Sequence, residues 1–251
     1  MSTKGLNDFV WYDLQTPDPK AAIGFYSKLF GWTPQGEPDS GHVGWNNGEN
    51  HFGGIGTPQA GVPAHWLGYV ETDALEGTVE RAKKMGAKVF AGPMSIGEGG
   101  DIAVVADPQG AAIGLYQGGK GHEGWEPRKT EPGDVGWAEL GTSDIDGARA
   151  FYGECFGWKT GQSMQMPDGV YHMVMKGETS IAGLYTKPAD MPVSAWTFYI
   201  NVNDVDETVA KAKALGGKLL VGPQTVPDMV TFAILTDPQG ATFGIAKSLG
   251  G

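Results

Sequence analysis

The feature that most constrains this chain is an internal duplication. The segment Phe25–Trp32 returns in the second half as residues 151–158, and both copies read Phe-Tyr-x-x-x-Phe-Gly-Trp. A pattern this long and this aromatic does not recur by chance at matching places. The glycine predicts a helix closed by a residue in the left-handed conformation, with the aromatic side chains pointing back into a core. The chain is therefore expected to contain two copies of one module.

Other repeated segments extend the duplication over nearly the whole chain. Asp107-Pro108-Gln109-Gly110 recurs as residues 237–240, and Gly92-Pro93 recurs as residues 222–223. Between the copies the sequence loses its periodicity and gathers Gly, Lys, Glu and Pro, which is typical of a linker. We predict a first module over residues 1–117, a linker over 118–133 and a second module over 134–251.

Each module is predicted to contain two units of one strand, one helix and three further strands. The first strand covers residues 9–14, and Asp18-Pro19 opens the first helix as N-cap and first helical residue. Helical spacing predicts a buried stripe made of Ala22, Ile23, Tyr26 and Phe30. The expected fold is α+β, with four β-α-β-β-β units.

Charge and composition exclude several classes of partner. The net charge is −11 and divides almost evenly between the two halves, so we expect no binding to nucleic acid or to an anionic membrane surface. No stretch has the apolar length of a membrane span, and the N-terminal residues lack an apolar signal core. Cys155 is the single cysteine. An internal disulfide is therefore impossible, which suits a cytoplasmic location.

The motifs together resemble the vicinal oxygen chelate superfamily, which includes glyoxalase I, bleomycin and fosfomycin resistance proteins and extradiol dioxygenases. The resemblance is carried by the repeated helix motif, by Gly53-Gly54-Ile55-Gly56 with its counterpart Ala182-Gly183-Leu184, and by the Asp-Pro-Gln-Gly turns. It implies that each module curls a mixed sheet into a cup for a small ligand, with the helices outside. It also implies a fused pseudo-dimer, present as a monomer or as a homodimer.

The family's metal positions are occupied here by residues that cannot bind a metal. Metal-using members carry a His in the first strand, a His or similar ligand in the fifth and a Glu in the eighth. The matching residues are Trp11, Trp66 and Gly114 in the first module, and Trp137, Trp196 and Gly244 in the second. Tryptophan and glycine offer no ligand to a divalent ion. We do not expect the five histidines to converge on a metal, and we predict neither a metal nor a cofactor.

Aromatic and acidic residues remain at these positions. Because side chains alternate along a strand, Trp11 shares a face with Asp13, and Trp137 shares one with Glu139. The predicted ligand-binding set is Trp11, Asp13, Trp66, Gly114, Tyr116, Trp137, Glu139, Met164, Trp196 and Gly244. The alternative for the tryptophans and for Met164 is packing within the core.

Asp13 and Glu139 are the candidates for a catalytic role. A desolvated carboxylate in such a cup can act as a general base. The alternative is a structural carboxylate paired with a main-chain N–H or with a nearby tyrosine.

These observations favour a metal-independent protein that binds a small apolar or aromatic ligand, including a cationic one. The use would be sequestration, as in drug resistance, or a step of natural-product metabolism. The alternative is a metal-dependent glyoxalase-type lyase or dioxygenase whose ligands come from other positions. If the protein is an enzyme, we expect a lyase, isomerase or oxygenase. In a third possibility, one module binds and the other only serves as a scaffold.

Overall fold

The computed structural model describes residues 5–36, 43–122, 124–125, 130–166 and 169–250. His42, which the sequence places in a hairpin, lies outside these residues. Within the described part of the chain, none of the helices is long and apolar enough to cross a membrane.

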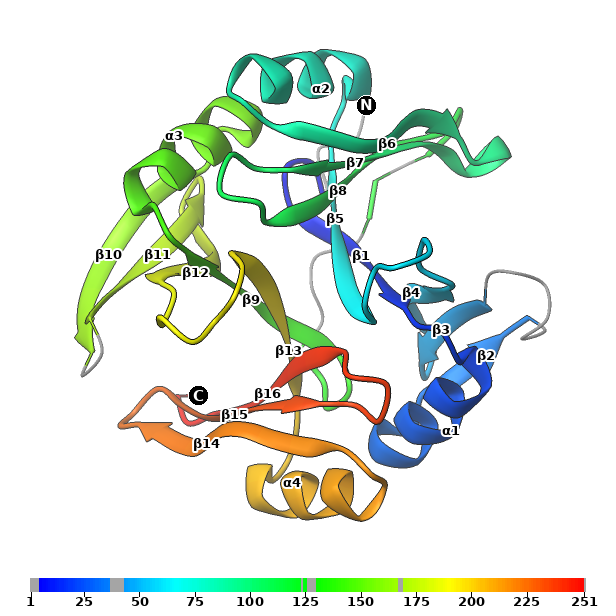
Figure 1. The fold of residues 1–251 in the computed structure, drawn as a ribbon, viewed down its shortest axis with the longest axis vertical. Coiled ribbons are helices and arrows are strands. Elements are labelled where there is room, and N and C mark those ends of the chain that lie inside the picture. The colour runs from blue at the N-terminus through cyan, green and yellow to red at the C-terminus, as the bar shows by residue number, and fades with distance from the viewer. Residues whose placement is uncertain (1–4, 37–42, 123, 126–129, 167–168, 251) are drawn as a thin grey trace. The chain divides into compact units, whose positions relative to one another are not determined.

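Helices and strands follow one another in the predicted order, with one strand, one helix and three further strands in each repeat (Figure 1). The first half contains β1 (Phe9–Gln15), α1 (Pro19–Phe30), β2 (Thr33–Gln35), β3 (Val43–Asn47), β4 (Asn50–Gly56), β5 (His65–Glu71), α2 (Leu75–Lys84), β6 (Lys88–Ser95), η2 (Gly97–Gly99), β7 (Gly100–Ala106) and β8 (Ala112–Gly118). The second half contains β9 (Val135–Thr142), α3 (Ile145–Phe156), β10 (Lys159–Met166), β11 (Gly169–Lys176), β12 (Thr179–Thr186), β13 (Ala195–Asn201), α4 (Val205–Ala214), β14 (Lys218–Val226), β15 (Val230–Thr236) and β16 (Thr242–Ser248).

Each half of the sequence forms one eight-stranded mixed sheet. The strand order is β2-β3-β4-β1-β5-β8-β7-β6 in the first sheet and β10-β11-β12-β9-β13-β16-β15-β14 in the second, so the two orders match strand for strand. Within a β-α-β-β-β repeat the first strand pairs in parallel with the last strand, as β1 does with β4 and β13 does with β16. The α+β fold of four β-α-β-β-β units is confirmed.

Spatial contacts group the chain differently from its sequence repeat. One compact unit comprises Met1–Val10, Gly68–Pro127 and Ala138–Trp196, and the other comprises Trp11–Leu67, Arg128–Trp137 and Thr197–Gly251. In the first unit α2 packs beside α3, and in the second α1 packs beside α4. Each unit therefore draws on both halves of the sequence. The predicted module boundaries stay a prediction.

The repeated helices begin and end as their sequence predicts. The Asp18 carboxylate accepts the Ala21 N–H at 3.0 Å, and Asp144 does the same for Gly147. Gly31 closes α1 at φ 81°, and its counterpart closes α3 at φ 70°. Glycine reaches this left-handed conformation without the steric cost of a Cβ atom.

The buried stripe of α1 differs from the prediction. The buried residues are Ala22, Phe25, Tyr26 and Leu29, while Ile23 and Phe30 are only partly covered. The stripe is thus turned by one residue, because Phe25 and Leu29 pack inward with Tyr26. Phe25 meets Phe243 of β16, a contact between distant parts of the chain that helical periodicity cannot reveal.

The two faces of each sheet differ in what covers them. One face packs against helices through aromatic side chains: in one unit Trp32, Trp45 and Tyr26 pack together, and in the other Trp158 packs on Tyr152. We call the opposite face of each sheet the open face. Side chains alternate between the two faces along a strand.

Candidate functional site

Trp66 and Trp196 lie in the helix-packed cores and not on an open face. The Trp66 indole N–H donates to the hydroxyl of Tyr26 at 3.0 Å, and the Trp196 N–H donates to Tyr152 at 2.9 Å. Both indoles are 8% exposed. Their placement agrees with the alternative of core packing, because each indole is bound by a buried tyrosine and does not reach an open face.

The same tyrosines bind the repeated Asp-Pro-Gln-Gly turns. Tyr26 donates to Asp237 at 3.1 Å, and Tyr152 donates to Asp107 at 3.0 Å. Burial, followed by the neighbouring carboxylate, raises the pKa of each tyrosine well above its ordinary value. Burial also raises the pKa of both aspartates, although main-chain N–H groups of the turn oppose the shift. These four residues are structural: each pair joins the first half of the chain to the second.

On β1 the predicted carboxylate is held by its own strand. The Trp11 indole N–H donates to Asp13 Oδ1 at 2.7 Å, and the His51 ring meets the Trp11 ring edge-on at 4.8 Å. Asp13 is 8% exposed. The structure thus brings Trp11 and Asp13 together, as predicted from strand alternation, and adds His51 from β4.

On β9 the corresponding carboxylate is bound by a tyrosine. The Tyr171 hydroxyl donates to Glu139 Oε1 at 2.7 Å. Glu139 pairs in register with Gly183 of β12, where a side chain would collide with the Tyr171 phenol. Gly183 therefore leaves room for the phenol to reach the carboxylate. This pairing agrees with the alternative of a structural carboxylate bound by a nearby tyrosine.

An aromatic row continues from this carboxylate across three strands. Met164 of β10 pairs with Tyr171 of β11, which pairs with Tyr185 of β12. Burial and the charge of Glu139 raise the pKa of Tyr185 to about 12. A methyl group at Gly141 would meet the Tyr185 hydroxyl and Met191 Sδ, so both side chains border the same spot. Met164 thus lies in the row, beside Tyr171.

The predicted glycines of the eighth strands are covered by tyrosine rings. A side chain at Gly114 would collide with Tyr69, and one at Gly244 would collide with Tyr199. Tyr69 and Tyr199 occupy matching places in register beside these glycines. The small residues thus give space to a neighbouring ring of the same sheet.

The donor groups do not fit a divalent metal ion. Within the residues that the structure describes, no three His, Cys, Asp or Glu side chains lie close enough together to hold one. His172 Nδ1 lies 2.7 Å from Arg149 Nη2 and 2.7 Å from Ser163 Oγ. Burial and the Arg149 charge lower the pKa of His172. His65 contacts the Pro63 carbonyl, and His122 contacts the Glu71 carboxylate. These three histidines therefore have separate partners and do not converge on one metal site.

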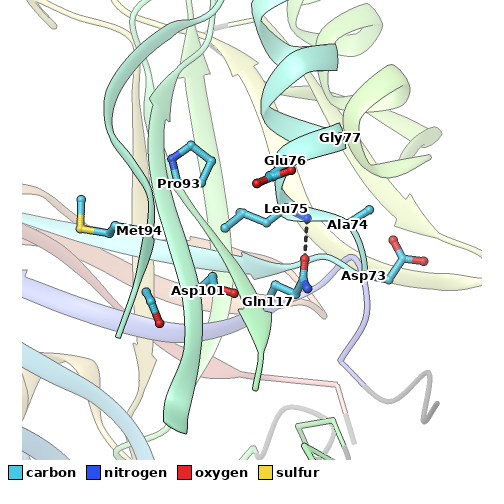
Figure 2. Close-up of a pocket in the computed structure, with 10 residues that line it drawn as sticks. Asp73, Ala74, Leu75, Glu76, Gly77, Pro93, Met94, Asp101 and Gln117 are labelled. Atoms are coloured by element: carbon cyan, nitrogen blue, oxygen red, sulfur yellow. Dashed lines mark hydrogen bonds between the residues drawn. The ribbon is translucent and has the colours of Figure 1, made fainter. Parts of the chain in front are cut away.

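A pocket of about 480 Å³ lies at the start of α2 (Figure 2). Its wall includes Asp73 just before α2, Glu76 in the first turn of α2, Met94 on β6 and Asp101 on β7. The side chain of Gln117, another lining residue, accepts the Leu75 N–H at 2.7 Å. None of the predicted site residues lines this pocket.

Two tyrosines of the aromatic row, Tyr171 and Tyr185, were not predicted from the sequence. They have no special spacing in the sequence, because what unites them is cross-strand register. Tyr26 and Tyr152 were visible as part of the repeated motif, and Asp107 and Asp237 as part of the repeated turn. What the sequence did not show is that each tyrosine binds the aspartate of the other half.

Comparison with known proteins agrees with this architecture. The family model of the Glyoxalase/Bleomycin resistance protein/Dioxygenase superfamily matches residues 8–115 and again residues 134–245. The chain is 35% identical over 246 residues to "Putative glyoxylase CFP32" of Mycobacterium tuberculosis, covering 94% of this chain and 93% of that protein. It is 33% identical over 258 residues to "Anthracycline biosynthesis protein DnrV" of Streptomyces peucetius, covering 94% and 92%.

Solved structures share the fold at low sequence identity. The Mn(II)-bound glyoxalase from Novosphingobium aromaticivorans superposes with a TM-score of 0.68 at 15% identity, covering 97% of this chain and 83% of that one. The 2,3-dioxygenase LapB from Pseudomonas sp. KL28 gives a TM-score of 0.68 at 14% identity, covering 98% and 94%. The chain thus belongs to the glyoxalase/bleomycin resistance protein/dioxygenase superfamily, with the family's module present twice.

Proposed function

We propose that this protein binds a small aromatic molecule on the open face of the second module without the help of a metal. The observation that carries the proposal is the hydrogen bond from Tyr171 to Glu139, which places a carboxylate at the end of a row of aromatic and thioether side chains. The ligand would be sequestered or would undergo a step of natural-product metabolism. The relative named for anthracycline biosynthesis supports the second use.

The chemistry of this row favours a flat ligand with a hydroxyl or ammonium group. Tyr171 and Tyr185 offer ring surface, and Met164 offers a flexible, polarisable side chain beside them. Glu139 is only partly buried, so a ligand donor can approach the carboxylate. A ligand donor that binds the carboxylate beside the Tyr171 hydroxyl would gain a charge-assisted hydrogen bond, while the hydroxyl keeps the carboxylate in position.

Metal independence is supported by the residues at the family's metal positions. Trp11 and Trp137 stand in the first strands, and Gly114 and Gly244 stand in the eighth. Asp13 and Glu139 have tryptophan and tyrosine partners, which are hydrogen-bond donors and not ligands of a divalent ion.

The test is native mass spectrometry of protein purified under mild conditions, with metal analysis of the same sample. The proposal expects an organic adduct, or uptake of a planar phenolic or cationic probe, with no stoichiometric metal. Glu139→Gln and Tyr171→Phe should each weaken probe binding about tenfold or more, the loss of one hydrogen bond to a charged group. Glu154→Gln, an exposed carboxylate on α3, is the matched control and should bind as the parent does.

Two results would overturn the proposal. A repeatable ratio of bound nickel, zinc, iron or manganese per chain would support the metal-dependent lyase or dioxygenase instead. Unchanged probe affinity in both site variants would remove the aromatic row as the binding surface.

A further inference from the structure

Part of the linker folds back onto the open face of the first sheet. The Trp66 side chain points into the helix-packed core and so marks the covered face of β5. Tyr69 and Glu71 lie an odd number of residues after Trp66 on the same strand, so their side chains point to the open face. Glu71 pairs in register with Tyr116 of β8, and the Tyr69 ring covers Gly114 of the same strand. These side chains form the open face of β5 and β8.

His122 and Trp125 cover this face. His122 Nε2 lies 2.9 Å from Glu71 Oε1, and the His122 ring meets the Tyr116 ring edge-on at 5.7 Å. The Trp125 ring lies 6.2 Å from Tyr116 and 5.9 Å from His122. At Gly118 any side chain would collide with the imidazole, so the ring lies directly on the strand. We call these two residues the linker cover.

The cover buries a charged group. The Glu71 side chain is 9% exposed and the His122 side chain 24% exposed. Burial raises the pKa of Glu71, while the charge and hydrogen bond of His122, the Trp125 main-chain N–H and the charge of Lys176 act in the opposite direction. Lys176 itself forms an ion pair with Asp8 at 3.1 Å. Removing the charged partner of a buried carboxylate is costly, so the His122 contact favours the covered arrangement.

The second sheet carries different residues at the equivalent places. Asn201 occupies the position of Glu71, Ala246 that of Tyr116, and Ser248 that of Gly118. These residues offer neither the carboxylate nor the aromatic ring on which the linker cover rests. The two sheets therefore differ in the residues of these strands as well as in the presence of the linker cover.

We propose that the linker cover occupies the open face of β5 and β8, so that this aromatic surface of the first sheet is closed to small molecules and the Glu139 row of the second sheet is the site that binds the ligand. This inference rests on the proposed function, because it explains why the Tyr69 and Tyr116 surface does not act as a further site. The chain supplies its own occupant for the first sheet. Release of His122 from Glu71 would uncover Tyr69 and Tyr116 as a second aromatic surface.

The test is a titration of the intact protein with the fluorescent probe thioflavin T, a flat cationic aromatic dye that suits an aromatic surface beside a carboxylate. The parent protein should bind one equivalent per chain. His122→Ala and Trp125→Ala should each bind a second equivalent, and hydrogen exchange should speed up at residues 118–122. His65→Ala is the matched control: its ring contacts the Pro63 carbonyl at the start of β5, and it should keep one equivalent.

Two further variants test whether the second equivalent binds to the uncovered face and does not result from misfolding. Glu71→Gln keeps the shape of the side chain but removes its charge, and it should also gain the second equivalent. The gain in His122→Ala should disappear again in the double variant His122→Ala/Tyr69→Ala.

The outcomes separate this inference from the proposed function. Two equal sites in the parent, or faster exchange in His122→Ala without a second site, would overturn the closure of this surface. If the parent takes up no probe while His122→Ala takes up one equivalent, the second-module site fails and the linker cover stands.

Discussion

The hydroxyl of Tyr152 donates a hydrogen bond to the carboxylate of Asp107, 3.0 Å away and 45 residues earlier in the chain. The same hydroxyl accepts the Trp196 indole N–H at 2.9 Å. An equivalent pair of hydrogen bonds joins Trp66 to Tyr26 and Tyr26 to Asp237, and this tyrosine and aspartate are 211 residues apart in the sequence. The repeated sequence motifs are thus the two ends of a hydrogen bond that joins the halves of the chain.

Removal of either tyrosine hydroxyl should destabilise the whole protein. Tyr152→Phe leaves a buried carboxylate oxygen and a buried indole N–H without their partner, which should cost about 2–4 kcal/mol of unfolding free energy. Tyr26→Phe should cost a similar amount because its partners are equivalent. Urea unfolding followed by circular dichroism measures both. Thr225→Val, which removes an exposed hydroxyl pair with Thr231, should change stability by less than about 0.5 kcal/mol. A loss below about 0.5 kcal/mol in Tyr152→Phe would show that these hydrogen bonds contribute little to the free energy of unfolding.

Two glycines of helix α1 should respond to alanine with opposite signs. Gly31 adopts φ 81° with no atom near its missing Cβ, so Gly31→Ala should cost about 1 kcal/mol through backbone strain alone. Gly24 lies inside the helix on its exposed side with equally open space, so Gly24→Ala should gain about 0.5–1 kcal/mol from helix propensity. Thermal unfolding of the two variants side by side checks the difference. Equal shifts would contradict a left-handed cap at Gly31.

Alkaline pH should weaken the fold over a defined range. Burial raises the pKa of Cys155 from 9.0 to about 11, and burial with the charge of Glu139 raises that of Tyr185 from 10.0 to about 12. A folded-state pKa above the unfolded value means that stability is complete below the unfolded pKa and is lost as pH rises through the folded one. The free energy of unfolding should therefore fall between about pH 9 and 12, with Cys155 acting first.

The matched variant for this effect is Cys155→Ala. It should lose about 1–2 kcal/mol at neutral pH because a buried sulfur is removed. Between about pH 9 and 11 its stability should fall less steeply than that of the parent. Denaturant unfolding at several pH values compares the two slopes, and identical slopes would contradict the assignment to the thiol.

Filling the space at Gly183 should disturb the Glu139 site while leaving its charge in place. A methyl group there collides with the Tyr171 phenol, so Gly183→Ala should displace the ring from Glu139 and weaken probe binding about as much as Tyr171→Phe. Gly177→Ala, at φ 59° in the turn between β11 and β12 and with no nearby atom, is the control for backbone effects on the same hairpin. The measurement is probe affinity by fluorescence. Equal affinity of Gly183→Ala and the parent would place the binding surface elsewhere.

Strand alternation predicted relative faces well but could not say which face is covered. It correctly grouped Trp11 with Asp13, since both are set by the two-residue repeat of one strand. It also put Trp66 at the centre of a ligand site, whereas the indole binds Tyr26 in the core. The helix that covers a face belongs to another segment of the chain, and alternation within one strand carries no information about it.

The sequence by itself determined the duplication, the order of strands and helices, the capping of the helices and the residue types at the positions that the resemblance assigns to a metal. These follow from local rules: side-chain period, capping chemistry and the donor atoms of each residue type. Only the tertiary structure decided that Tyr152 binds Asp107, that Tyr171 binds Glu139 and that His122 rests on Glu71. Each of these pairs is separated by at least 32 residues in the sequence. Such partners are selected by packing and sheet register, because a buried polar group needs a partner wherever the folded chain can supply one.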